Sequence, residues 1–335
     1  MPVLLTMKKR YWIAGASGLA GAAVAAKLMT RPVDVDWEKS ADLVYHRRHS
    51  RFIEVEGIPV HYQEAGDPNA PVLVLIHGFV SSTLVWAEVF LPLAGAGFRV
   101  IVPDLLGYGY SGKPAEGDYT IEAQAHMIAG LMKRLEIQSA ILVGSSYGGA
   151  VAATIALDHP ALAERLVLIG AVTNDEPKKF LLLRATRSPL LGDVLAPLLL
   201  GSRWVLRLRM KKSYHRSGRV FDENKLASRH HALATVNTQR AVLRTLRGWH
   251  AGYIQREAHL IQQPTLLIWG ENDPEIPLRD GEHLRDEMPN ARLIVFRKCG
   301  HLPQEEFPQQ FVQVVAGFCK EPLAMSPVAV VPGSS

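Results

Sequence analysis

The sequence predicts a doubly wound α/β fold, with a mostly parallel sheet and an inserted helical cap. Short apolar runs recur along the chain, and segments with helical periodicity separate most of them. The alternation is interrupted once, over residues 172–258, where helical stretches occur without a clear buried strand. The 335 residues are 48% hydrophobic and 21% charged, a globular composition that excludes a disordered chain, a collagen-like chain and a protein with many membrane spans.

The expected strands begin with two short ones between residues 51 and 66, around a turn at Gly57. Further strands are expected at residues 72–76, 98–102, 140–143, 166–169, 265–269 and 293–296, and helices at about 83–95, 120–135, 147–158, 278–288 and 305–319. The strand runs are apolar throughout, which is typical of strands buried on both faces. The core is therefore expected to comprise residues 50–171 and 259–321, and the proline-containing segment 322–335 to be a disordered tail.

Residues 1–31 have the pattern of a signal peptide or a membrane anchor. Three basic residues, Lys8 to Arg10, precede 16 uncharged residues rich in Ala and Gly, and Ala23 to Ala25 offers a cleavage site. As a helix the uncharged stretch would span roughly 24 Å, short of a bilayer core of about 30 Å unless Lys27 reaches the headgroups. We therefore expect a membrane-anchored or exported protein with its catalytic body outside the cytoplasm. The alternative is a cytoplasmic protein in which this segment packs on the domain.

Gly15, Gly18 and Gly21 resemble the glycine fingerprint of the short-chain dehydrogenases. That motif requires a buried strand before it and a βαβ unit after it. Here the preceding residues are Lys-Lys-Arg-Tyr-Trp-Ile, and a different fold begins by residue 50. No nucleotide and no other organic cofactor is therefore expected.

The formal net charge of +5 comes from two segments. Residues 1–31 contribute +5, and residues 172–258 have 17 Lys and Arg against 6 Asp and Glu, so the rest of the chain is acidic. The basic segments carry no zinc-finger, RNA-binding or helix-turn-helix signature, and no nucleic-acid partner is expected.

Two cysteines, Cys299 and Cys319, exclude a disulfide framework and a cysteine-rich zinc site, and no metal is expected. The oligomeric state is left open.

The strand at residues 140–143 runs into Gly144-Ser-Ser-Tyr-Gly148 and then into a helical segment. A G-x-S-x-G sequence between a strand and a helix predicts a nucleophilic serine on a turn so tight that Cβ atoms at the two glycines would clash. The register selects Ser146, because Ser145 would require a glycine in place of Val143. The N-terminus of the following helix favours developing negative charge at the serine.

With these residues the sequence resembles the α/β-hydrolase family over about residues 50–320. The other matching pieces are His77-Gly78-Phe79, Asp104 to Ser111, Gly270 to Asp273 and Gly300-His301. The resemblance implies a triad in the chain order nucleophile, acid, histidine, which Ser146, Asp273 and His301 satisfy.

Chain position also favours these two partners of the serine. Asp273 and His301 each follow a predicted strand, at the carboxyl edge where Ser146 lies and where ligands bind in open α/β sheets. The imidazole would take the serine proton, and the acid would fix its tautomer and stabilise the imidazolium. Asp175, just past the strand at 166–169, is a rival acid, and the alternative for Asp273 is a turn residue before a proline.

The oxyanion hole is expected to consist of two backbone N–H groups. One belongs to Tyr147, directly after the nucleophile, and the other to Phe79, in the loop after His77-Gly78. Structural roles are expected for four other polar residues: a hydrogen-bonding role for His77, a loop-shaping role for Asp104 and Ser111, and capping or anchoring of the closing helix by Glu306.

A serine at the elbow implies an acyl-enzyme and therefore ester substrates, and it sets the chain apart from haloalkane dehalogenases and epoxide hydrolases, which use aspartate there. The cap segment 188–210 is rich in leucine, and Arg203, Arg207, Arg209, Lys211 and Lys212 lie within or beside it. This pattern resembles membrane-associated, monoacylglycerol-lipase-type hydrolases, and favours lipophilic acyl esters and a basic face toward a membrane surface. The alternative is that the cap helices simply bury their apolar faces on the core.

Two other functions are compatible with the same residues. A carbon–carbon bond hydrolase of vinylogous diketo acids would use the same triad with a cationic pocket, for which the cap supplies arginines. A small-molecule receptor built on this fold would bind its ligand without turnover, although an intact triad argues against it.

Overall fold

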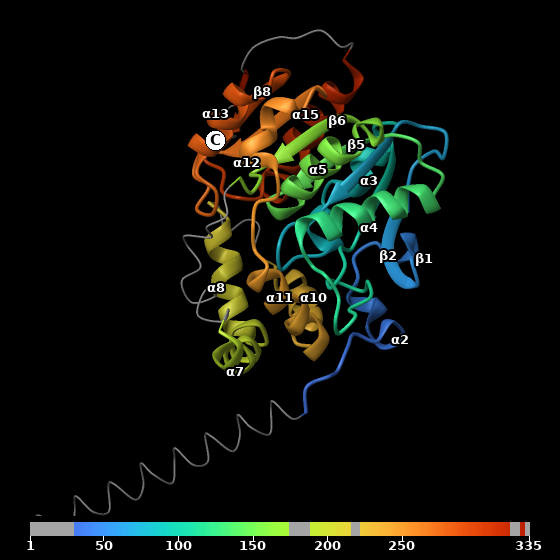
Figure 1. Cartoon of the computed structure of the whole chain (residues 1–335), viewed down its shortest axis with the longest axis vertical. Helices are drawn as coiled ribbons and strands as arrows, with labels where there is room; N and C mark the ends of the chain where they lie inside the picture. Colours follow the sequence, from blue (N-terminus) through green and yellow to red (C-terminus); the bar gives the residue numbers. More distant parts are fainter. Residues whose placement is uncertain (1–29, 174–187, 216–221, 322–328, 332–335) are drawn as a thin grey trace, which may run out of the picture.

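The computed structural model describes residues 30–173, 188–215, 222–321 and 329–331 (Figure 1). These residues contain a nine-stranded sheet with the order β1-β2-β4-β3-β5-β6-β7-β8-β9. The pairs β1–β2 and β2–β4 are antiparallel and the other pairs are parallel, which confirms the predicted fold class. The strands are β1 (Ser50–Val55), β2 (Ile58–Ala65), β3 (Val72–Ile76), β4 (Arg99–Pro103), β5 (Ala140–Ser145), β6 (Ala163–Ile169), β7 (Thr265–Gly270), β8 (Ala291–Phe296) and β9 (Ala329–Val331).

The core helices form two packed groups. In one group α4 contacts α5, which contacts α12, and in the other α3 contacts α15. Because the apolar side chains of β3, β5 and β7 are buried on both faces of the sheet, the two groups cover opposite faces. These core helices are α3 (Phe90–Gly95), α4 (Ile121–Arg134), α5 (Tyr147–Asp158), α12 (Ile254–Glu257), α13 (Leu278–Glu287), α14 (Pro303–Glu306) and α15 (Pro308–Lys320). Short 3₁₀ helices are η1 (Ala41–Leu43), η2 (Arg47–His49), η3 (Thr83–Trp86), η4 (Pro160–Leu162) and η5 (Ala258–Leu260).

Three segments differ from the sequence-based expectation. The helix expected at 83–95 is divided into η3 and α3, and the closing helix is divided into α14 and α15. The second division falls at Pro308, which lacks an N–H group and is suited to the first position of a new helix. In the expected disordered tail, Ala329–Val331 instead form β9, an apolar strand that pairs with β8. The other tail residues lie outside the described residues.

Between β6 and β7 the described residues of the cap are mainly helical. The cap helices are α7 (Pro189–Leu200), α8 (Arg203–Ser213), α10 (Glu223–Leu233) and α11 (Val236–Arg247). Three of them begin with a side-chain cap that the sequence supplies, because Ser202, Asp222 and Thr235 each accept a hydrogen bond from a first-turn N–H. Helix α7 packs on α8 and α11, and α8 packs on α10, so these helices form one unit beside the sheet (Figure 1).

Residues 30–36 form a strap that crosses the cap before the chain enters the core. The carbonyls of Pro32 and Val33 accept hydrogen bonds from the first two residues of α11, at 3.0 and 2.9 Å. Asp34 Oδ1 lies 3.0 Å from Nζ of Lys113, whose side chain is 1% exposed. The strap therefore links the cap to the core, and α2 (Trp37–Ser40) follows it directly.

The predicted leader, apart from its last two residues, lies outside the described residues. Among the helices that the structure describes, none is long and apolar enough to cross a bilayer.

Candidate active site

The turn between β5 and α5 places Ser146 in a strained backbone conformation. Its φ is 55° and its ψ is −116°, a region that side-chain-bearing residues rarely adopt. A Cβ at Gly144 would collide with the backbone of Gly148, and a Cβ at Gly148 with the carbonyl of Ile76. The two glycines of the motif are thus required by backbone packing. Ser145, by contrast, is the last residue of β5 and is buried.

His301 and Asp273 meet at the carboxyl ends of β8 and β7. His301 Nδ1 lies 2.7 Å from Asp273 Oδ2, and a carboxylate can only accept, so Nδ1 carries the proton and Nε2 is left to act as a base. Asp273 Oδ1 accepts the N–H groups of Glu275 and Ile276 at 2.7 and 2.9 Å, which fixes the carboxyl group. Gly170 supplies room beside this pair, because a Cβ there would lie 3.1 Å from both side chains.

The loop that presents His301 is tied to the cap. The backbone N–H of His301 donates to the carbonyl of Ser213, the last residue of α8, at 2.8 Å. Glu306 accepts hydrogen bonds from the N–H groups of Gly300 and His215 at 2.6 and 3.0 Å. Glu306 therefore anchors the histidine loop to His215, two residues after the end of α8, whereas the sequence predicts a role for it at the closing helix.

Phe79 and Tyr147, the expected oxyanion-hole residues, lie on either side of the nucleophile. Tyr147 is the first residue of α5. The N–H groups in the first turn of a helix have no carbonyl acceptor within that helix. Phe79 follows Gly78, and a Cβ added to Gly78 would lie only 3.1 Å from Ser146 Cβ, so this loop touches the nucleophile. Both residues are therefore next to Ser146, as expected for oxyanion-hole donors.

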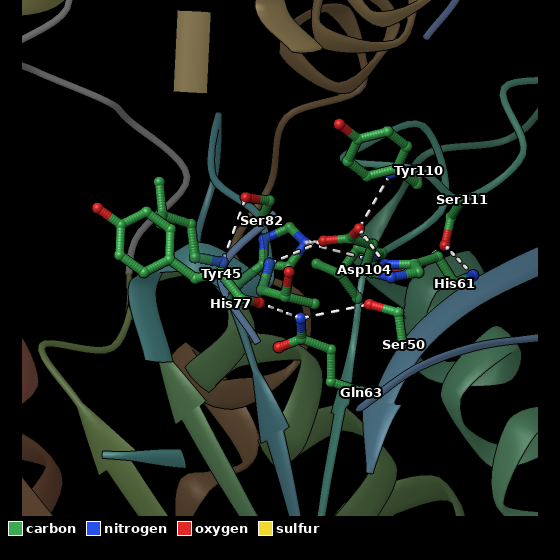
Figure 2. Close-up of polar contacts among 12 residues, drawn as sticks. Tyr45, Ser50, His61, Gln63, His77, Ser82, Asp104, Tyr110 and Ser111 are labelled. Carbon is green, nitrogen blue, oxygen red and sulfur yellow. Dashed lines mark hydrogen bonds and ion pairs between the residues drawn. The ribbon is translucent and has the colours of Figure 1, made fainter. Parts of the chain in front are cut away.

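A buried carboxylate holds the loops next to the elbow (Figure 2). Asp104 accepts hydrogen bonds from His61 Nδ1 at 2.7 Å, from the N–H of Thr83 at 2.8 Å and from the N–H of Tyr110 at 2.9 Å. Burial raises the pKa of Asp104, but the hydrogen bond and charge of His61 outweigh it, and the net shift is downward. Asp104 thereby shapes the loops after β3 and β4, in agreement with the structural role expected for it.

His77 connects the same two loops. Its Nε2 accepts the N–H of Leu105 at 3.0 Å, so its Nδ1 carries the proton and donates to the carbonyl of Gly78 at 2.8 Å. Burial lowers the pKa of His77 and keeps the ring neutral. This histidine is a fixed support for the loop that contains Phe79.

A cavity of about 170 Å³ opens in front of the elbow, and Ser146 and His301 both line it. Its apolar wall comes from the segment between β3 and α3, from α8, from the residues after α11 and from the residues next to Asp273 and His301: Phe79, Val80, Val85, Leu206, Met210, Trp249, Ile276 and Leu302. The cavity can therefore hold an apolar group directly beside a serine and an imidazole.

Charged residues that the sequence analysis did not assign to the site also line this cavity. Glu275, two residues after Asp273, has its Oε2 3.7 Å from His301 Nε2. Arg209 and Arg229 approach from α8 and α10. Arg229 is paired at 2.6 Å with Glu305, a buried carboxylate that also accepts the Tyr214 hydroxyl at 2.9 Å. The fold of the cap over the sheet brings Arg209 and Arg229 to the triad candidates, whereas Glu275 reaches His301 from the turn after Asp273. No motif in the sequence marks either placement.

The two carboxylates next to His301 change its proton affinity. Burial alone would lower the pKa of His301, but Asp273 and Glu275 outweigh burial and raise it to about 9. A rise of this size is typical of groups in functional sites.

Two further expectations concern residues outside this cluster. Asp175, the rival acid, lies outside the described residues. Within the described part of the chain, no group of three or more His, Cys, Asp or Glu side chains is arranged to hold a metal ion. Cys299 is buried beside Glu306, and burial raises the pKa of its thiol.

Comparison with known proteins identifies the family. A family model described as alpha/beta hydrolase fold matches residues 71–308, so the chain belongs to the alpha/beta hydrolase family and is a hydrolase of that family. It is 28% identical over 277 residues to the uncharacterized hydrolase YugF of Bacillus subtilis (strain 168), covering 81% of this chain and 97% of YugF. It is 31% identical over 284 residues to the 2-hydroxymuconate semialdehyde hydrolase of Pseudomonas sp. (strain CF600), covering 78% of this chain and 90% of the relative.

One solved structure is similar over nearly the whole chain. It is a membrane phospholipase A, described as a bacterial virulence factor, with a TM-score of 0.69 and 23% identity over 95% of this chain and 98% of the other. At this identity the similarity concerns the fold.

The Asp104 network predicts a pH-dependent loss of stability. Replacing Asp104 by Asn leaves buried donors poorly matched, and we expect the free energy of unfolding to fall by about 1–3 kcal/mol at pH 7. Because the pKa of Asp104 is lowered in the folded protein, its contribution is present above the unfolded pKa of roughly 3.9 and is lost as the pH falls below it.

The difference between Asp104→Asn and wild type should therefore narrow in acid, as measured by denaturant unfolding from pH 7 to pH 3. Asp67→Asn, in an exposed turn, is the control and should change stability little. A difference that stays constant down to pH 3 would contradict this assignment.

Proposed function

We propose that the protein is a serine hydrolase of carboxylic esters that acts through an acyl-enzyme on Ser146. The observation on which the proposal depends is the arrangement of three groups around one cavity. Ser146 lines it from the elbow, His301 lines it from the opposite loop, and Asp273 holds His301 Nδ1 at 2.7 Å. In this mechanism Ser146 Oγ attacks the ester carbonyl while His301 Nε2 takes its proton. The N–H groups of Phe79 and Tyr147 stabilise the oxyanion.

The second half of the reaction follows from the same atoms. The imidazolium of His301 returns its proton to the departing alkoxide, and the alcohol leaves. A water molecule then gives a proton to His301 and attacks the acyl carbonyl. The bond between the acyl carbon and Ser146 Oγ breaks, His301 returns the proton to Oγ, and the acid leaves. No step requires a metal or organic cofactor.

The cavity walls support a lipophilic acyl group. Phe79, Trp249 and Met210 present aromatic and flexible apolar surface next to Ser146. Phe79 and Trp249 pack edge to face with ring centroids 5.2 Å apart. We therefore propose that acyl esters of monoacylglycerol type are the substrates. Esters whose acyl group is charged or polar should be poor substrates.

A carbon–carbon bond hydrolase is the second candidate. The similarity to the 2-hydroxymuconate semialdehyde hydrolase favours it, and Arg209 and Arg229 line the cavity where such a substrate's carboxylate would need a cation. The pairing of Arg229 with Glu305 and the presence of Glu275 beside His301 reduce the positive charge that is available there. We therefore rank ester hydrolysis first.

We also propose that the outer face of α8 contacts an anionic lipid surface. Trp204 and Leu208, one turn apart, are 68% and 48% exposed, and Leu198 of the neighbouring α7 is exposed as well. Lys211 and Lys212 are exposed at the end of the same helix. Apolar residues beside cations match the acyl boundary and headgroups of an anionic bilayer. Such contact would place a membrane-anchored or exported enzyme on its substrate.

Substitution of the nucleophile tests the proposed reaction. In Ser146→Ala we expect kcat for aryl esters to fall by at least about 10³-fold, because the acyl-enzyme cannot form. Steady-state assays with a chain-length panel of aryl esters, and with a vinylogous diketo acid, measure both reactions in parallel. Unchanged folding is checked by circular dichroism. Ester hydrolysis that survives in Ser146→Ala, or activity on the diketo acid with none on esters, would overturn the proposal.

The pH profile should show an alkaline optimum. His301 must be neutral to accept the serine proton, and its pKa is raised to about 9. We therefore expect kcat/KM for an ester to rise with pH, roughly tenfold per unit below that pKa, and to level off near 9. Assays from pH 6 to pH 10 measure this, with Ser146→Ala reporting the uncatalysed hydrolysis. A plateau already reached at pH 7 would contradict the raised pKa.

Vesicle binding tests the proposed lipid contact. In the full chain, Trp204→Ser combined with Leu208→Ser should weaken binding to phosphatidylglycerol vesicles at least about tenfold, because apolar area is lost from the contact. Leu260→Ser is the matched control, since it removes an exposed leucine on η5, outside the cap. Co-sedimentation at low and high salt provides the measurement. Equal vesicle binding by the double variant and the control would show that the outer face of α8 is not the lipid-contact surface.

A further inference from the structure

His301 lies between two carboxylates that come from one turn. Asp273 Oδ2 is 2.7 Å from Nδ1, and Glu275 Oε2 is 3.7 Å from Nε2 on the other edge of the ring. The backbone N–H of Glu275 itself donates to Asp273 Oδ1 at 2.7 Å. The turn that orients the triad acid therefore also sets the position of the second carboxylate.

Glu275 is ionised and faces the cavity. Its Oε1 accepts the hydroxyl of Ser213, and its side chain is 20% exposed. Burial raises the pKa of Glu275, but His301, Arg209 and Arg229 together with the Ser213 hydroxyl outweigh it, and the net shift is downward. An ionised carboxylate has only acceptors, so any group that binds to it from the cavity has to be a donor.

The 3.7 Å gap between Glu275 Oε2 and His301 Nε2 is too long for a direct hydrogen bond. A hydroxyl oxygen on the cavity side could lie about 2.8 Å from each atom at once. Nε2 is also the atom that returns the proton to the departing alkoxide. The alcohol part of the ester therefore leaves the serine next to Glu275.

We propose that Glu275 recognises a free hydroxyl group on the alcohol part of the substrate, on the carbon adjacent to the one that bears the ester oxygen. This rests on the proposed ester hydrolysis and narrows its substrate class to esters of vicinal diols and polyols, such as glycerol. A hydroxyl in this place donates to the Glu275 carboxylate. A simple alkyl alcohol would cover the carboxylate without offering it a donor, which costs binding free energy.

A matched pair of substrates tests the inference. Glycerol monobutyrate and propyl butyrate have the same acyl group and the same three-carbon chain, and differ in the two hydroxyls. Wild-type kcat/KM should favour the glycerol ester by roughly tenfold or more, as expected for a hydrogen bond to a charged group. Glu275→Ala should abolish this preference, measured as the ratio of kcat/KM for the two esters at one pH, because a change in the pKa of His301 affects both esters alike.

Two further variants complete the experiment. Glu275→Gln retains the size and one acceptor oxygen, and should keep part of the preference. Glu271→Gln alters an exposed glutamate that lies two residues before Asp273, as Glu275 lies two after it, and should behave as wild type.

The outcomes separate the inference from the proposed function. Hydrolysis of both esters that persists in Ser146→Ala overturns the proposed function, and the inference with it. Hydrolysis that requires Ser146, while Glu275→Ala and Glu275→Gln change kcat/KM for both esters by the same factor, would assign the carboxylate to His301 alone. That result would overturn only the inference. The absence of any preference in the wild type would do the same.

Discussion

The close approach of two backbones at the centre of the sheet is the constraint on which the site depends. Gly144 and Gly148 have no room for a Cβ, because the elbow packs on itself and on the carbonyl of Ile76 at the end of β3. This packing forces Ser146 to a positive φ and exposes its side chain to the cavity. It also brings the loop of Gly78 into contact with Ser146, so one packing event places both the nucleophile and the expected oxyanion donors.

Two histidine–carboxylate pairs of equal length flank this packing, and they differ in what faces the second ring nitrogen. His61 and Asp104 are 2.7 Å apart, and so are His301 and Asp273. Aromatic rings, including that of Trp37, surround His61, and its Nε2 is buried with no hydrogen-bond partner among the described residues. The Nε2 of His301 lies at the cavity beside Glu275. The His61 pair can therefore only hold loops together, whereas the His301 pair is open to the cavity, as the proposed proton transfer requires.

The fold class and the three triad candidates could be predicted because their signals are local. Apolar runs mark the strands, and the glycine spacing marks the elbow whatever the rest of the chain does. Asp273 and His301 can be predicted because each follows a strand at the edge where Ser146 lies. The approach of Arg209 to the triad candidates depends on how the cap folds over the sheet. The positions of Glu275 and Glu305 depend on the turn after β7 and on α14, and neither placement leaves a periodic trace in the sequence. The strand β9 cannot be predicted, because three residues are too few to show the apolar pattern of a strand.

The end of α8 is part of the support for His301. The carbonyl of Ser213 accepts the backbone N–H of His301, the Ser213 hydroxyl binds Glu275, and Glu306 joins Gly300 to His215. These hydrogen bonds connect the last turn of α8 to the histidine loop, so the two segments have to move together. A displacement of this helix end would break the backbone hydrogen bond of His301, so the substrate route that preserves the triad is one that leaves this end of the cap in place.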